Sequence, residues 1–376
     1  MGDSAKPLSA LISQVRTLRS TGLAAAEPHA ATLTLGVYIA SAIQAHGGEL
    51  LRQLERYGWV QQDQAFAKDV DLVGLYHEVQ KFKYQRLAEI GSGAYGVVHK
   101  AQNRDTHEIV AIKKLRYSLD GGGFPDSTIR EICSLKQLRH PNIVELKDVI
   151  ATVNSPSVYL VLECMDCDLG RYLATCVGAS DLHQVKSVMF QIIRGIHHAH
   201  SHLVMHRDMK PQNVLVDTKT GVVKLTDFGL ARQYLPPFKA YTEKVVTLYY
   251  RCPELLLGAP GYSTAVDMWS IGCIFAELAN FATLFKADSE IGMLHAIFKT
   301  LGTPGPDTWL DIVNTQHYRA DFPQWHARDF AEVCPTLAEL PEALDLLSRL
   351  LAYDPRKRIS AYQALSHPWF HDMGSC

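Results

Sequence analysis

Apolar residues in the first eighty positions recur at steps of three and four, which is the spacing of an amphipathic helix. Two such stripes are Leu8, Leu11, Ile12, Val15 and Leu18, and Val70, Leu72, Leu75 and Val79. Another helix is expected to begin at Leu50, and the breakers between these segments are Gly22, Pro28 and Gly47–Gly48. The pattern predicts a helical extension over residues 1–80 whose apolar faces need a surface to pack on.

From residue 84 the pattern changes to short β-branched runs, which predict strands. Val97–Val98 follow a glycine-rich turn, and Val110–Lys113 form the next run. Helical spacing returns after Pro125, where the apolar residues are Ile129, Ile132, Leu135 and Leu138. The proline, with a Ser-Thr pair behind it, suits the start of a helix at this point.

Composition narrows the class of protein. The 376 residues correspond to two or three domains at about 150 residues each. Hydrophobic residues make up 47% and charged residues 20%, which excludes wholesale disorder. Lys and Arg total 37 against 39 Asp and Glu, so a strongly basic nucleic-acid binder is not expected. There is no long apolar run, and the eight scattered cysteines indicate reduced thiols, so we expect an intracellular protein without a membrane span.

The glycine-rich turn predicts a phosphate site. Gly91, Gly93 and Gly96 form a G-x-G-x-x-G pattern, and glycine lets the backbone approach a polyphosphate closely. A dinucleotide fold needs a helix after such a turn, whereas a strand is predicted here, and no P-loop sequence occurs. Lys113 at the end of the next strand fits a lysine directed at α- and β-phosphates. Glu131 on the following helix would hold that lysine through an ion pair.

Three polar residues further along the chain match the needs of phosphoryl transfer. Asp208, Asn213 and Asp227 lie around two short runs, Val214–Val216 and Val222–Leu225, that predict a pair of strands. The reaction needs a carboxylate to accept the nucleophile's proton and oxygen ligands to hold Mg²⁺ on the phosphates. The pairing of two strands would bring these three side chains to one edge.

With these motifs in this order, residues 84 to about 370 resemble a eukaryotic protein kinase domain, specifically the cyclin-dependent kinase family. The resemblance implies an α+β bilobal kinase fold that follows the helical extension. A β-rich N-lobe at about 84–162 and a helical C-lobe at about 166–370 would hold ATP between them. The subfamily is indicated by five stretches: 125–131, similar to the helix that cyclins grip, 242–254, 267–272, 301–304 and 354–360.

The resemblance also implies roles for individual residues. Asp208 would be the catalytic base, and Lys210, at the position typical of serine/threonine kinases, would lie near the transferred phosphate. Lys113 and Glu131 would form the ion pair, and Asn213 and Asp227 would bind Mg²⁺. The implied ATP contacts, with 160–165 as hinge and Leu162 as gatekeeper, are Ile90, Gly91, Gly93, Gly96, Val98, Ala111, Lys113, Leu162, Glu163, Met165 and Asp168.

A regulatory switch is implied at Thr242. A phosphate on this residue, added by an activating kinase, would carry close to two negative charges. The matching arginine cluster, which would bind it through paired hydrogen bonds, is Arg130, Arg207 and Arg232. Many relatives carry a Thr-Tyr pair of inhibitory sites in the glycine loop, whereas here Ala94 precedes Tyr95, so only Tyr95 remains a candidate.

Substrate recognition is implied by the segment that follows. Val245 and Val246 resemble the pocket that accepts a proline after the target residue, and the docking segment continues through Thr247 and Arg251. Proline lacks an N–H, so it leaves no donor unpaired in such a pocket. The expected substrates are Ser/Thr-Pro sites in proteins. Arg358 would pair with Glu254 behind this segment.

The implied partner is a cyclin-like subunit, in cell-cycle control or, as the runner-up, in transcription, with a location in the nucleus and/or cytoplasm. A catalytically dead scaffold is disfavoured because the motif residues are intact. The extension either presses the helix of Glu131 inward, supplementing a cyclin, or serves as an interaction module. Two patterns are interpreted as structural: Cys164-x-x-Cys167, which lacks a second pair for zinc, and the histidines at 197–202, which fit packing at a helix end.

Overall fold

The computed structural model describes residues 83–93, 96–116, 126–152, 157–175, 181–233 and 248–373. The predictions for residues 1–80, Tyr95, Thr242 and 245–247 lie outside the described residues. The chain divides into two compact units. The first comprises Met1–Phe124 and Lys147–Cys164, and the second comprises Pro125–Leu146 and Met165–Cys376.

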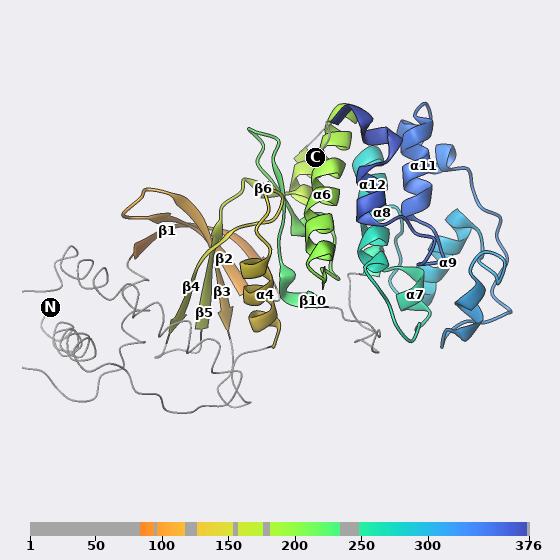
Figure 1. Ribbon diagram of the computed structural model, residues 1–376, viewed down its shortest axis with the longest axis horizontal. Helices are drawn as coiled ribbons and strands as arrows, with labels where there is room; N and C mark the ends of the chain where they lie inside the picture. Colours follow the sequence, from red (N-terminus) through yellow and green to blue (C-terminus); the bar gives the residue numbers. More distant parts are fainter. Residues whose placement is uncertain are drawn as a thin grey trace, which may run out of the picture. The chain divides into compact units, whose positions relative to one another are not determined.

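A five-stranded sheet in the order β1-β2-β3-β5-β4 forms the described part of the first unit (Figure 1). Its strands are β1 (Tyr84–Gly93), β2 (Gly96–Asn103), β3 (Ile109–Arg116), β4 (Leu146–Thr152) and β5 (Ser157–Glu163). β1 and β2 form a hairpin that pairs Gly93 with Gly96, so a strand follows the glycine turn, as predicted. Apolar residues on both faces are buried, among them Leu160 and Val161 at the middle of β5.

Gly96 is the glycine that the backbone of this hairpin requires. Its φ of 137° lies in a region that residues with a side chain rarely adopt. A β-carbon at Gly96 would lie 2.0 Å from the carbonyl oxygen of Lys114 on β3. The glycine therefore lets the start of β2 approach the backbone of β3, the neighbouring strand that carries Lys113.

The second unit is mainly helical. Its α-helices are α4 (Asp126–Gln137), α5 (Leu169–Thr175), α6 (Leu182–Ser201), α7 (Pro253–Leu256), α8 (Ala265–Asn280), α9 (Glu290–Leu301), α10 (Phe330–Val333), α11 (Pro341–Leu350) and α12 (Ala361–Leu365). Its strands are β6 (Cys167–Asp168), β7 (Val204–Met205), β8 (Val214–Val216), β9 (Val223–Leu225) and β10 (Arg232–Gln233). Its 3₁₀ turns are η2 (Pro211–Asn213), η3 (Phe228–Leu230), η4 (Leu248–Tyr250), η5 (Leu310–Asn314), η6 (Pro335–Leu337) and η7 (Pro368–Met373).

α8 is the core of this unit, since 14 of its 16 residues are buried. A helix that is apolar all round must be covered on every side, and α6 and α11 pack against it (Figure 1). α6 begins at Asp181, whose carboxylate accepts hydrogen bonds from the backbone N–H groups of His183 and Gln184. No helix in the described ranges is both long and apolar enough to cross a membrane.

The predicted helix after Pro125 is α4, and it groups with the second unit because it packs against η3. Its residues Ile132, Leu135 and Leu138 are buried, as the apolar stripe predicted. The predicted strand pair is also present, as β8 and β9, which join β6 in a three-stranded sheet. These elements bring Glu131 and the residues of the catalytic motifs into one compact unit.

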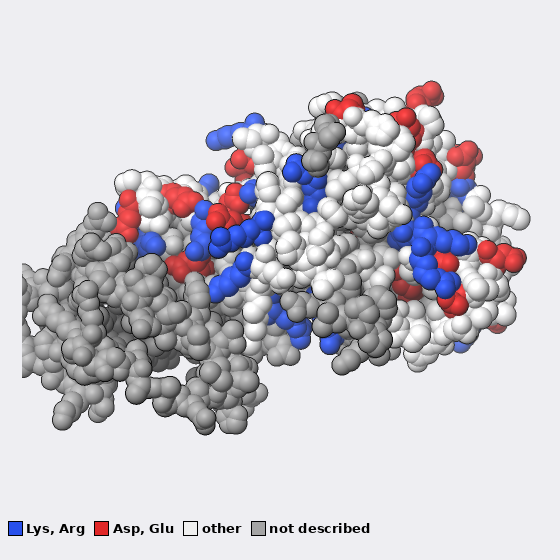
Figure 2. All heavy atoms as spheres, in the orientation of Figure 1, with Lys and Arg blue, Asp and Glu red and all other residues white. Residues whose placement is uncertain are grey.

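Charged side chains of both signs are interspersed on the face shown in Figure 2. Several form ion pairs at the surface: Lys186–Asp372 at 2.8 Å, Arg349–Asp345 at 2.9 Å and Arg356–Asp311 at 3.0 Å. Exposed pairs of this kind contribute only about 0–1 kcal/mol each, because water screens them and long side chains lose entropy. The stability of the unit therefore depends on its buried contacts.

Candidate active site

The sheet of the first unit places four of the predicted nucleotide contacts on one face. In the strand register, Val98 lies opposite Lys113, and Ala111 lies opposite Leu162. Residues 111 and 113 are two apart on β3, so all four side chains share this face. Lys113 is only 8% exposed. An ammonium group on a largely apolar, buried face is suited to hold an anion close to an apolar ring system.

In the second unit, Asp208 lies between two polar neighbours. Its Oδ2 accepts hydrogen bonds from Lys210 Nζ at 2.6 Å and from Asn213 Nδ2 at 3.1 Å. Asn213 Nδ2 also donates to the backbone oxygen of Asp208 at 2.7 Å. Both of these bonds use the nitrogen of the Asn213 amide, which turns its oxygen away from Asp208. The three residues therefore form one preorganised group, with an amide oxygen left to face a cation.

Asp267 on α8 holds the backbone that carries Asp208. Its buried carboxylate accepts hydrogen bonds from the backbone N–H groups of His206 at 2.9 Å and Arg207 at 2.8 Å, and from His200 Nε2 at 2.8 Å. Burial alone would raise the pKa of Asp267, but the bond to His200 and the other donors outweigh it and lower the pKa. The carboxylate is thus a fixed negative charge that fastens the turn before Asp208.

The sequence analysis did not predict that Asp267 and His200 fasten the backbone turn before Asp208. Arg207 adopts a left-handed backbone conformation, with a φ of 66°, which the two bonds to Asp267 hold in place. The available signal was an acid inside the apolar run of residues 265–279, because an unpaired buried carboxylate is too costly to retain without donors. The histidine cluster fits helix-end packing as interpreted, but one member, His200, is a hydrogen-bond partner of the site.

The buried side chain of Arg207 connects the turn before Asp208 to two other segments of the second unit. Its Nε donates to the backbone oxygen of Leu230 at 2.7 Å, and its Nη1 donates to the hydroxyl of Tyr262 at 2.7 Å. Burial raises the pKa of Tyr262, and the charges of Arg207 and Arg232 act in the opposite direction. The hydrogen bond between Arg207 and Tyr262 is a contact that no sequence motif had indicated.

Asp227 and Glu131 approach each other beside Gly229. Asp227 has a left-handed φ of 62° and precedes η3. A β-carbon on Gly229 would lie 3.4 Å from Asp227 Oδ1 and 3.7 Å from Glu131 Oε2, so glycine keeps this approach open. His206 Nε2 lies 2.9 Å from the backbone oxygen of Thr226 and links the Asp227 turn to the Asp208 turn. The acidic residues of the site are thus joined through short backbone contacts.

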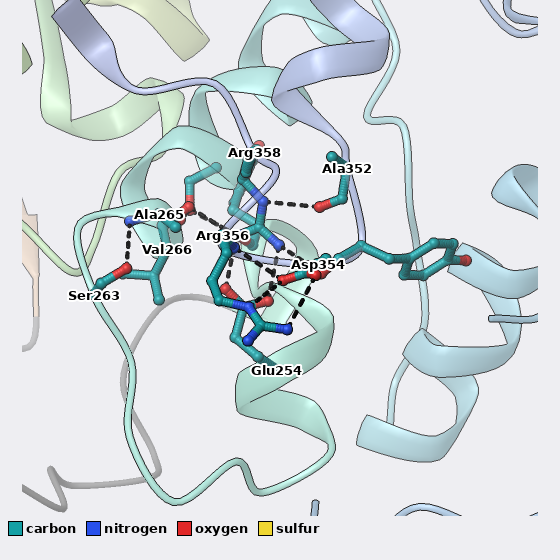
Figure 3. A network of polar contacts seen from close by, with 11 residues as sticks. Glu254, Ser263, Ala265, Val266, Ala352, Asp354, Arg356 and Arg358 are labelled. Atoms are coloured by element: carbon teal, nitrogen blue, oxygen red, sulfur yellow. Dashed lines mark hydrogen bonds and ion pairs between the residues drawn. The ribbon is translucent and has the colours of Figure 1, made fainter. Parts of the chain in front are cut away.

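A buried ion pair joins Glu254 and Arg358 (Figure 3). Arg358 Nη1 and Nη2 donate to the two carboxylate oxygens of Glu254 at 2.6 and 2.9 Å, which confirms the predicted pair. Arg358 also donates to the backbone oxygens of Ala352 at 3.0 Å and Ala265 at 2.8 Å, and it lies over the Trp269 ring. Burial opposes its charge, but Glu254 outweighs burial and raises the pKa of Arg358.

Residues 84–370 match the family model of the protein kinase domain, over about three quarters of the chain. The chain belongs to the protein kinase family. This protein kinase accordingly has a β-sheet N-lobe and a helical C-lobe and is a phosphotransferase that binds ATP. Within this kinase domain, the second unit contains both the hydrogen-bonded group around Asp208 and the buried Glu254–Arg358 ion pair.

The oxygen ligands of this kinase fit a hard cation such as Mg²⁺. The carboxylate of Asp227 and the amide oxygen of Asn213 are ligands of the type that Mg²⁺ prefers, and it commonly binds through one or two carboxylates plus phosphate oxygens. Over the described ranges, no cluster of three or more His, Cys, Asp or Glu side chains is arranged to hold a metal ion.

The remaining predicted residues lie as follows. Arg251 Nη1 pairs with Glu290 Oε1 at 2.7 Å at the start of α9. Asp168 accepts a hydrogen bond from the backbone N–H of Arg171 at 3.0 Å and so begins α5. Glu163 ends the first unit's β5, whereas Met165 belongs to the second unit. The structure thus assigns Asp168 a helix-starting contact in addition to its predicted role.

The cysteine and histidine patterns behave as structural features. Cys167 pairs with Val216 in the small sheet, and Cys133, Cys252, Cys273 and Cys334 are free thiols. His198 stacks on His140 at 4.9 Å and packs beside His202 at 4.2 Å. These rings are packed against one another near the end of α6.

Stability is expected to fall as the pH drops from 6.5 to 4 because of His140. Its Nδ1 accepts a hydrogen bond from the backbone N–H of Asn142 at 3.0 Å, which requires the neutral ring. Burial lowers the pKa of His140 to about 4, and the charged groups that face it and also lower it are His198, Arg194, His197 and Lys224. The unfolded chain binds this proton near pH 6.5, so stabilisation is present above 6.5 and is lost toward 4.

The measurement is the melting temperature of the protein between pH 7.5 and 4. His140→Asn retains an acceptor for the Asn142 N–H but does not titrate, so its melting temperature should fall less over this window. His183→Asn, on the exposed first turn of α6, is the control and should follow the wild type. Identical pH profiles for the wild type and His140→Asn would contradict the assignment.

Proposed function

We propose that this protein kinase is a serine/threonine kinase of the cyclin-dependent type, which transfers the γ-phosphoryl group of ATP to Ser/Thr-Pro sites. The 2.6 Å contact between Lys210 and Asp208 is the observation that carries the proposal. A lysine two residues after the base is similar to the serine/threonine class. It places a positive charge beside the carboxylate that receives the substrate's hydroxyl proton.

In this proposal the chain's own groups position the reaction. Asp208 orients the substrate hydroxyl and accepts its proton, while Lys210 stabilises the negative charge that develops on the phosphoryl oxygens. Asn213 and Asp227 would hold Mg²⁺, and Lys113, supported by Glu131, would hold the ATP phosphates. Bound ATP supplies the phosphoryl group, and Mg²⁺ neutralises its charge.

Substrate class is tested with three matched peptides and Mg-ATP. A Ser-Pro peptide should be phosphorylated, the Ser-Ala version should react much more slowly, and the Tyr-Pro version should not react. Equal rates for Ser-Pro and Ser-Ala would contradict proline recognition by Val245 and Val246. Transfer to the Tyr-Pro peptide would contradict the serine/threonine assignment. The assay should be run with the chain alone and with partners recovered from its own cells, because a cyclin-like subunit predicts activity only in the complex.

The phosphorylation switch at Thr242 is part of the same proposal. Arg207 follows directly before the base Asp208 and is held by Tyr262 and Leu230, which supports a link between the phosphate and the catalytic turn. Bidentate arginine–phosphate bonds would hold a phosphate on Thr242. Thr242→Ala should lower the activity of the assembled complex, and full activity of this variant would contradict the switch. Thr218→Ala, in an exposed turn of the second unit, is the matched control.

A further inference from the structure

The face of the first-unit sheet opposite Lys113 carries a groove. Side chains alternate along a strand, so Ile112 and Lys114 point to the face that Lys113 does not use. The groove has a volume of about 410 Å³. The residues that line it, hereafter the sheet groove, are Tyr84, Arg86, Glu89, Val97, His99, Ala101, Ile112, Lys114, Ile150 and Tyr159.

The floor of the sheet groove is apolar. It is formed by the buried cluster Ala101, Val110, Ile150 and Val161, against which Tyr84, Ile112 and Tyr159 pack. None of the helices described by the structure lies wholly in the first unit. An apolar sheet face is normally covered by another layer of the protein. This groove is therefore a surface that a further segment can bury.

His99 adds a polar requirement to the occupant. Its Nδ1 is buried and, among the described residues, has no hydrogen-bond partner. Burial lowers the pKa of His99, and the charges of Arg86 and Lys114 lower it further against the opposing charge of Glu89, which favours the neutral ring. A buried polar atom without a partner is unfavourable, and a neutral imidazole nitrogen can donate or accept a hydrogen bond. The occupant is thus expected to present a polar group to His99 between its apolar side chains.

We infer that residues 69–82 of this chain dock into the sheet groove. The segment ends at Lys83, the first described residue, which has helical geometry and is followed directly by Tyr84 in the groove wall. Its apolar residues recur at helical spacing and are Leu72, Leu75, Val79 and Phe82. The segment carries three acids, Asp69, Asp71 and Glu78, against one lysine, Lys81, whereas the groove carries Lys114 and Arg86 against one acid, Glu89, which lies 3.9 Å from Arg86.

Chain connectivity favours this occupant over a separate molecule. A residue spans at most about 3.6 Å of extended chain, so Val79 is held within about 18 Å of Tyr84. Tethering at this range corresponds to an effective concentration in the millimolar range or above. A second copy of the chain would first have to lose its translational and rotational freedom. Residues 69–82 therefore lose much less translational and rotational freedom on binding the groove than a separate molecule would.

Photo-crosslinking in the full chain tests the inference without relying on activity. Tyr159→p-benzoylphenylalanine places a photoreactive group in the groove, and Tyr362→p-benzoylphenylalanine, exposed on the second unit, is the control. We expect mass spectrometry to find crosslinks from position 159 to residues 69–82 within one chain, and none to that segment from position 362. Crosslinks to residues 1–68 only, to a second copy, or to nothing would overturn the inference.

A second variant pair tests the apolar contact itself. Burial of a leucine side chain is worth about 1.5–3 kcal/mol, so Leu75→Asp should lower the crosslink yield at position 159 about tenfold or more. Leu11→Asp makes the same chemical change in the other apolar stripe of the extension and should leave the yield unchanged. A yield that is insensitive to Leu75→Asp, or equally sensitive to Leu11→Asp, would contradict docking by residues 69–82.

Discussion

Asp208→Asn should lower kcat for phosphoryl transfer by about 10²–10⁴-fold, the usual contribution of a positioned general base. Asparagine has nearly the shape of aspartate and can still accept a hydrogen bond from Lys210, but it cannot take up the hydroxyl proton. Since Asp208 is bound by both Lys210 and Asn213, the geometry of the site should persist. The loss is therefore expected in kcat, with little change in KM for ATP.

The measurement is steady-state phosphorylation of a Ser-Pro peptide, together with thermal unfolding of the variant. Asp181→Asn is the matched control, because Asp181 begins α6 and asparagine is an equally good N-terminal cap. It should retain wild-type kcat and stability. An Asp208→Asn enzyme with kcat within threefold of wild type would show that another group accepts the proton.

Arg358→Met should destabilise the second unit by about 3–5 kcal/mol, the typical effect of removing one partner from a buried ion pair. Glu254 is only 1% exposed and would be left as a buried carboxylate without a counter-charge. At about 2–4 °C per kcal/mol, the melting temperature should fall by roughly 6–20 °C. Arg358→Met also removes the bonds to the carbonyl groups of Ala352 and Ala265.

The matched control is Arg356→Met, two residues earlier. Arg356 is 62% exposed and pairs with Asp311 at the surface and with Asp354, which is 4% exposed but also accepts a hydrogen bond from the backbone N–H of residue 356, so removing this side chain should cost much less than removing Arg358. Glu254→Gln combined with Arg358→Met leaves no buried charge and should recover part of the loss. If Arg356→Met proved as destabilising as Arg358→Met, burial of the pair would not be what makes it important.

Local patterns were sufficient to predict several elements of this kinase. The glycine turn followed by a strand, the Lys113 strand, the helix of Glu131 and the β8–β9 pair each follow from spacing within a dozen residues. Because Asp208 and Lys210 are only two residues apart, their contact could also be expected from the sequence. For these features, one short segment contains all the information that its structure needs.

Long-range contacts of the site were beyond such patterns. Asp267 binds the backbone of Arg207 from 60 residues away, and Tyr262 binds its side chain from 55 residues away. Neither contact leaves a periodic trace, because it depends on where α8 packs. The Glu254–Arg358 pair was predicted only through the family resemblance. The sheet groove likewise depends on which strand faces are left uncovered, and that becomes visible only when β1, β2, β3, β4 and β5 are assembled.

The ion pair of Glu254 and Arg358 also constrains how the protein is made on the ribosome. Its two residues are 104 positions apart, so at about 5–20 residues per second Glu254 is synthesised roughly 5–20 seconds before its partner. The ring of Phe275 on α8 packs against that of Trp369 at 4.7 Å, and the interval between the synthesis of these two residues is almost as long. The helical unit therefore completes its core only after Trp369 has emerged, and until then its α8 surface needs protection from aggregation.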